Sequence, residues 1–139
     1  MAARGLAPSR GPAALRGVVM ALHWTAALAV VGWLAGALPT GALVLHAGAW
    51  AAVTVAWGPR GGPSPALPRP WRALAWWGQA ALLGLYVVGA GMALFGWPLA
   101  RPVLIATLGA GALHGVFNAW RASVLGDGAF RRMTPRALW

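Results

Sequence analysis

The chain has 139 residues, of which 60% are hydrophobic and 9% charged, and eleven arginines against one acidic residue give a net charge of +10. Soluble domains average about 25% charged residues, so this composition argues against a water-soluble bundle. The arginines flank apolar runs rather than lining one face, which argues against a nucleic-acid partner, and the absence of cysteine excludes disulfides, iron–sulfur clusters and haem attached through cysteine.

Four uncharged apolar stretches follow one another along the chain, at residues 18–38, 42–57, 73–97 and 102–120. A helix needs roughly 20 apolar residues to cross a bilayer. The first stretch is longer than the apolar core of a signal peptide, so we expect a retained span. The second is the shortest, so its helix either extends beyond the stretch or thins the bilayer locally. The sequence therefore predicts one all-α domain over residues 1–139, an integral membrane four-helix bundle in contact with lipid.

The arginines are distributed unevenly over the segments between these spans. Most lie before the first span, in the proline-rich segment 58–72 and in the C-terminal tail, whereas the turn before the fourth span has Arg101 alone. By the positive-inside rule, both termini are predicted to be cytoplasmic (N-in, C-in). Asp127 and the terminal arginines fit a role in capping the last helix and holding this topology. The alternative is that the basic tail docks an acidic partner protein.

All three histidines lie inside predicted spans, where an ionisable side chain usually marks a functional site. His23 lies ~9 Å and His114 ~10 Å from the cytoplasmic surface, at 1.5 Å per residue. Two level imidazoles can supply both axial ligands of a haem iron, with Arg16, Arg72 and Arg121 as cations for its propionates. The alternative is that each histidine forms an interhelical hydrogen bond.

Two further features of the spans have a structural and a functional interpretation. Gln79 lies at the level of the two histidines and could bond a haem propionate or a quinone carbonyl, or form an interhelical hydrogen bond. Glycines in the third and fourth spans either let helices pack closely or leave room for a flat cofactor. They are Gly84, Gly89, Gly91, Gly109, Gly111 and Gly115.

Several motifs resemble those of the bacterial cytochrome b561 family, which is related to the cytochrome b subunit of Ni/Fe hydrogenases. They are Leu22-His23-Trp24, His46 with Gly48 followed by Arg60 and a proline-rich loop, the segment 74–79 (LAWWGQ), and His114 followed thirteen residues later by the segment 127–135 (DGAFRRMTP). The resemblance extends from about Arg16 to Pro135.

The resemblance implies a multi-pass cytochrome of the bacterial inner (plasma) membrane that holds haem b between histidines. Such proteins exchange electrons with quinone, for example ubiquinone, in respiratory electron transport, and some oxidise superoxide. His23 and His114 match the cytoplasmic-side haem ligands, and His46 matches a ligand of a second haem. The histidines expected to accompany His46 are replaced by Ala100 and by Gln79 with Trp76, so we expect one haem.

The leading hypothesis is therefore a bis-histidine electron-transfer cytochrome, with no acid–base catalytic residue, working with quinone or a redox partner protein. The alternative is a cofactor-free membrane scaffold or accessory subunit that has lost its haem sites. The sequence leaves open whether the chain is an oxidoreductase in its own right, and whether it acts within a homo- or hetero-oligomer.

Overall fold

The computed structural model describes residues 13–57, 67–126, 128 and 134, and four helices account for most of them. These are α1 (Ala13–Leu34), α2 (Thr40–Trp57), α3 (Arg69–Leu94) and α4 (Ala100–Val124). No strand occurs within the described residues. Each helix coincides with one predicted apolar stretch, so the expected all-helical architecture with four helices is confirmed.

Glycines turn the chain after α1 and after α3, and both of these helices end earlier than the sequence predicts. The last residue of α1 is Leu34, because Gly36 adopts a φ of 75° and the amide of Leu38 bonds back to the Gly32 carbonyl at 3.0 Å. A left-handed residue after the helix, with amides returning to the last turn, is a common helix C-terminus. Gly96, with a φ of 66°, ends α3 in the same way.

The remaining boundary differences extend the helices: all four begin earlier than the sequence predicts, and α4 also ends later. Pro68 caps the start of α3 and Pro70 lies in its first turn, where the missing amide of proline costs no hydrogen bond. The α4 helix continues past Trp120 to Val124 and therefore includes Arg121. The extensions of α3 at its start and of α4 at its end add charged residues, which a search for uncharged stretches leaves out.

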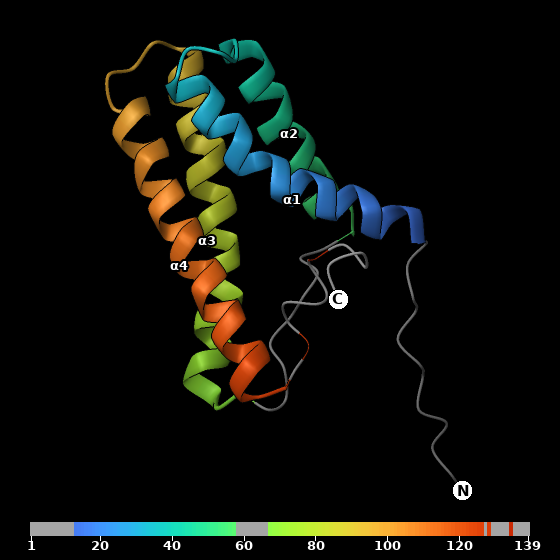
Figure 1. Cartoon of the computed structure of the whole chain (residues 1–139). Helices are drawn as coiled ribbons and strands as arrows, with labels where there is room; N and C mark the ends of the chain where they lie inside the picture. Colours follow the sequence, from blue (N-terminus) through green and yellow to red (C-terminus); the bar gives the residue numbers. More distant parts are fainter. Residues whose placement is uncertain (1–12, 58–66, 127, 129–133, 135–139) are drawn as a thin grey trace, which may run out of the picture.

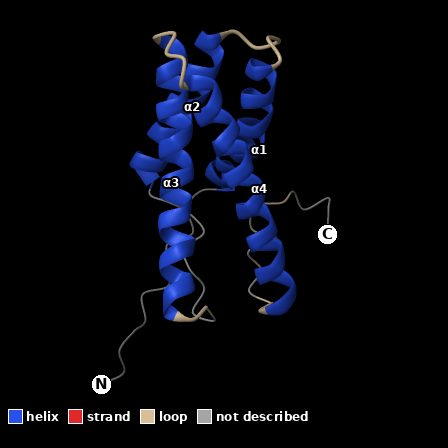
Figure 2. Cartoon of the chain, turned by 90° about the vertical axis from the view of Figure 1, so that its left-hand side faces the viewer, coloured by secondary structure: helices blue, strands red, loops and turns tan. Residues whose placement is uncertain are grey.

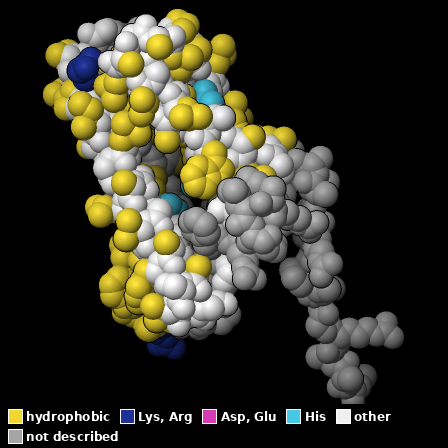
Figure 3. Space-filling view, viewed as in Figure 1, with side chains coloured by type: hydrophobic (Ala, Val, Ile, Leu, Met, Phe, Trp, Pro, Cys, Tyr) yellow, Lys and Arg dark blue, Asp and Glu magenta, His cyan; other side chains and the backbone are white. Residues whose placement is uncertain are grey.

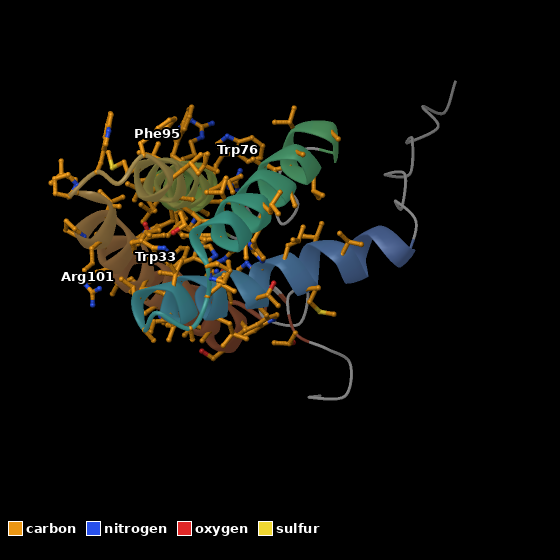
Figure 4. All side chains as sticks on the ribbon, turned by 90° about the horizontal axis from the view of Figure 1, so that it is seen from above. Trp33, Trp76, Phe95 and Arg101 are labelled. Carbon is orange, nitrogen blue, oxygen red and sulfur yellow. The ribbon has the colours of Figure 1, made fainter. Side chains whose placement is uncertain are left out.

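The helices pack in chain order, α1 against α2, α2 against α3 and α3 against α4, with a smaller contact between α1 and α4. Figures 1 and 2 show that α3 and α4 extend beyond α1 and α2 at the end where α4 stops, while the first half of α1 points away from them. Figure 4, which looks down the bundle, shows Trp33 between the helices and Arg101 at the outer edge.

The buried core lies in the half of the bundle that contains the α1–α2 and α3–α4 turns. Its members come from all four helices: Ala29, Val30, Leu43, Ala47, Tyr86, Ala90 and Leu104. Gly89 is packed so tightly that a Cβ there would lie 2.8 Å from Leu104 Cδ2. The core therefore ends before the level of His23 on α1 and of His114 on α4.

Apolar side chains cover the outside of the helices. Three helices, α1 from Gly17, α3 and α4, are long and apolar enough to cross a membrane, and between 6% and 17% of their apolar windows is buried inside the bundle. The α2 helix is apolar but shorter. On the face drawn in Figure 3, hydrophobic atoms spread over the helices and arginine atoms lie toward the two ends.

Several sequence predictions concern residues outside the described part of the chain. They include Arg60, Asp127, Arg131 and Arg132, and with them most of the segment 127–135 that carries the strongest family resemblance. Arg16 belongs to α1, but its side chain is outside the described set.

Candidate functional site

His23 of α1 and His114 of α4 face each other across the bundle. Their ring centroids are 6.4 Å apart and the ring planes are inclined by 59°. His23 lies ten residues after the start of α1 and His114 ten residues before the end of α4, about 15 Å along each helix. The structure thus brings together the two histidines for which the sequence predicts one depth.

The two rings lie on segments of α1 and α4 in which every residue is at least partly exposed. None of residues 17–28 of α1 and none of residues 108–120 of α4 is buried. Gly111 and Gly115, which flank His114 on α4, would have nothing within 4 Å of an added Cβ. Of the two interpretations of the glycines, Gly89 fits close helix packing, while nothing lies within 4 Å of an added Cβ at any of the other five.

Asn118, one turn after His114, determines which ring nitrogen of His114 carries the proton. Its Nδ2 lies 2.8 Å from His114 Nε2 and 2.9 Å from the His114 carbonyl oxygen, while its Oδ1 accepts a bond of 3.4 Å from Arg121 Nη1. Because the amide nitrogen can only donate, His114 Nε2 is an acceptor. A neutral His114 therefore carries its proton on Nδ1 and keeps a lone pair on Nε2.

His46 of α2 has both ring nitrogens occupied by side chains. Nε2 lies 2.8 Å from Thr25 Oγ1 on α1, and Nδ1 lies 2.9 Å from Tyr86 Oη on α3. No group of three metal-ligating side chains occurs within the described residues, so His46 does not join the other two histidines in one cluster. Its expected role as a ligand of a second haem stays a prediction from resemblance.

Trp50 of α2 is in contact with both histidine regions. Its ring makes edge contacts with His23, at a centroid distance of 5.6 Å, and with His46, at 6.5 Å. Tyr86 lies against the same indole at 6.3 Å. A continuous row of aromatic contacts therefore connects the His23–His114 pair with His46.

The remaining predicted site residues lie on α3 and α4. Gln79 is half-buried, ten residues after the start of α3 and so at the same depth as the histidine pair. Arg121 is 1% exposed, with its guanidinium 5.7 Å from the Phe117 ring centroid. Arg72 donates from Nε to the Leu67 carbonyl at 2.6 Å. Arg72 and Arg121 belong to the ends of α3 and α4 that lie side by side.

The histidine pair can be tested against the requirements of a metal held by two imidazoles. Metal–imidazole bonds are about 2 Å long, which places the centroids of two rings on opposite sides of one ion roughly 6 Å apart. The observed 6.4 Å agrees with that spacing. The donor set is also suitable, because haem iron accepts two neutral imidazoles. One rearrangement is required, since the Asn118 amide must turn away from His114 Nε2.

Asn118, Thr25, Tyr86 and Trp50 were not identified from the sequence as part of this region. Two signals were available: Asn118 is four residues after His114, a spacing that places both on one helix face, and Tyr86 is the single tyrosine of the chain. Comparisons with protein-family models, curated proteins and solved structures found no match.

Proposed function

We propose that this chain is a b-type cytochrome of the bacterial inner membrane, which holds one haem b between His23 and His114. The proposal depends on one observation, that imidazoles from α1 and α4 meet with centroids 6.4 Å apart. Haem bound to two histidines supplies reversible one-electron chemistry at iron. Electrons would be exchanged with quinone or with a redox partner protein.

The protein would contribute the ligands and the charges around the haem. His23 and His114 would bind as neutral imidazoles, and the lone pair on His114 Nε2 is the one suited to the metal. Arg72 and Arg121 lie at the nearby helix ends and, with Arg16, would stabilise the propionates. Gln79, at the same depth, is the candidate donor to a quinone carbonyl.

Membrane insertion is supported by where the exposed apolar groups lie. Large side chains such as Leu28, Leu113 and Val116 are 68–72% exposed in the middle of their helices, where a soluble protein would place polar residues. Arg69, Arg72 and Arg121 lie at one end of the bundle and Arg101 at the other. The positive-inside rule then places both termini in the cytoplasm.

The Asn118 contact favours a second candidate, a cofactor-free membrane scaffold. In the structure, His114 Nε2 accepts a hydrogen bond of 2.8 Å from the amide, so the histidine is satisfied without a metal. A chain that never binds haem would keep this arrangement, with His114 serving only to bond its neighbour on α4.

A visible absorption spectrum separates the two candidates. The full chain, purified from membranes in mild detergent with haem supplied, is expected to show the sharp reduced bands of bis-histidine haem after dithionite and after a soluble quinol. His114→Ala is expected to lose these bands, whereas Ser123→Ala, on the same helix, is expected to keep them. If the wild-type protein shows no haem bands, the scaffold is supported. If the reduced haem bands appear with dithionite but not with the quinol, quinol is excluded as the electron donor.

A further inference from the structure

The hydrogen bonds around His46 run in one direction. Thr25 Oγ1 lies 2.6 Å from the Ala21 carbonyl oxygen, which can only accept, so the Thr25 hydroxyl proton points to that oxygen. Thr25 Oγ1 must then accept from His46 Nε2, which therefore carries the ring proton. In a neutral ring Nδ1 has the lone pair, and it accepts from the Tyr86 hydroxyl.

The resulting series of hydrogen bonds runs from Tyr86 on α3 through His46 on α2 to Thr25 on α1, and ends at the Ala21 carbonyl. Ala21 and Thr25 bracket the helical turn that contains His23. Residues 17–28 of α1 include no buried side chain, and the residues of this helix that are buried in the core begin at Ala29. The directed bond between Thr25 and His46 adds a polar contact between α1 and α2 in this less buried part of the helix.

We propose that His46 is a positioning residue for the His23–His114 pair, acting through Thr25. This inference rests on the proposed function, since His23 needs a fixed direction only if it binds a ligand with His114. Tyr86 holds the His46 ring, the His46 ring holds the Ala21–Thr25 turn, and that turn directs His23 toward α4. His46 thus acts on the metal site without being a ligand.

Removal of the Thr25 hydroxyl tests this role, with Thr54 as a matched control. Thr54 Oγ1 bonds the carbonyl four residues earlier, at 2.9 Å, as Thr25 does, but this bond lies within one helix. Four variants of the full-length protein are compared with wild type, each with one substitution: Thr25→Val, Thr25→Ser, Tyr86→Phe and Thr54→Val. Because the chain has no cysteine, spin labels at Leu28→Cys and Leu113→Cys report the α1–α4 distance by pulsed electron paramagnetic resonance.

Thr25→Val and Tyr86→Phe are expected to shift or broaden the α1–α4 distance. They are also expected to weaken haem binding about threefold, which is the effect of one interhelical hydrogen bond in a membrane protein. The low-spin ferric g values should change as well, because they depend on the angle between the imidazole planes. Thr25→Ser, which keeps the hydroxyl, is expected to have the wild-type distance, haem affinity and g values. Thr54→Val is expected to leave all three unchanged.

The outcomes separate this inference from the proposed function. If wild type binds haem and Thr25→Val matches it in g values and in α1–α4 distance, the positioning role is wrong while the cytochrome proposal stands. If wild type binds no haem, the cytochrome proposal fails. The spin-label distance alone then decides whether the hydrogen bonds of His46 fix the position of α1 relative to α4. An equal response from Thr54→Val would also overturn the inference, because the effect would then not be specific to the bond with His46.

Discussion

Asn118 is the residue on which the proposed metal site depends most closely after the two histidines. In the structure its amide donates to His114 Nε2 at 2.8 Å, the ring atom whose lone pair would bind a metal. A metal and the amide proton cannot use that lone pair together. Asn118 therefore competes with haem, and the strength of this single bond sets how much of the binding free energy is lost.

Asn118→Ala is expected to strengthen haem binding. A hydrogen bond of this kind contributes about 1 kcal/mol, so removal of the competitor should raise haem affinity roughly fivefold. The measurement is a haem titration of the purified apoprotein followed by absorbance. Ser123→Ala, which removes a hydroxyl bonded to the Trp120 carbonyl at 3.0 Å, serves as the control. Weaker binding by Asn118→Ala would mean that the amide supports the bound state instead.

The two histidines and their common depth could be predicted at the residue scale from sequence, because depth follows from the count of residues along a straight helix. Their partners could not. Which face of α1 carries Thr25 toward α2 depends on the rotation of that helix, and a helix that is apolar all round has no sequence pattern to set it. The bonds of His46 to Thr25 and Tyr86 are therefore visible only in three dimensions.

At the scale of the helices, the existence of all four could be predicted, but several of their ends could not. Residues 35–38 are apolar and uncharged, so they look like a continuation of the first span, yet they form a capping turn around Gly36 with its φ of 75°. Glycine occurs both inside these helices and after them. Composition does not tell which glycine will adopt the left-handed conformation.

Gly89 of α3 packs tightly against Leu104 of α4, and its substitution is expected to destabilise the packing of these two helices. A Cβ there would lie 2.8 Å from Leu104 Cδ2 and 2.9 Å from its Cγ, and overpacking of this kind costs about 1–3 kcal/mol. Gly89→Ala should therefore lower the free energy of unfolding, measured by denaturation in mixed detergent micelles.

Gly91→Ala is the matched control for that substitution. It lies on the same helix with nothing within 4 Å of an added Cβ, so alanine should be neutral or stabilise α3 by up to about 1 kcal/mol through helix propensity. The Gly89→Ala, Leu104→Ala double variant should lose less stability than the sum of the two single losses, because the added methyl group fills part of the space that the leucine leaves. Equal stability of Gly89→Ala and Gly91→Ala would contradict the close approach of α3 and α4.

At the scale of the whole molecule, the distribution of apolar surface and arginine leads to one expected topology. The helix exteriors are apolar, and the end formed by Arg69, Arg72 and Arg121 is expected to face the cytoplasm. The turn between α3 and α4 would then face the opposite side, together with the turn between α1 and α2.

Single cysteines test this topology directly, since the chain has none of its own. Pro98→Cys, in the α3–α4 turn, is expected to react with a membrane-impermeant maleimide added to intact cells with a permeable outer membrane. Ser123→Cys, at the other end of α4, is expected to react only after the inner membrane is disrupted. The reverse labelling pattern would mean that the protein has the opposite orientation in the membrane. Reaction of both cysteines in intact cells would mean that α4 does not span the membrane.

The meeting of His23 and His114 at 6.4 Å is the observation on which the functional account depends. The most direct test is the haem content per chain, measured by the pyridine haemochrome assay on the purified full-length protein after expression with haem supplied. The account predicts about one haem per wild-type chain, and almost none in His23→Ala and in His114→Ala. A wild-type chain without haem, or haem retained in full by both variants, would contradict it.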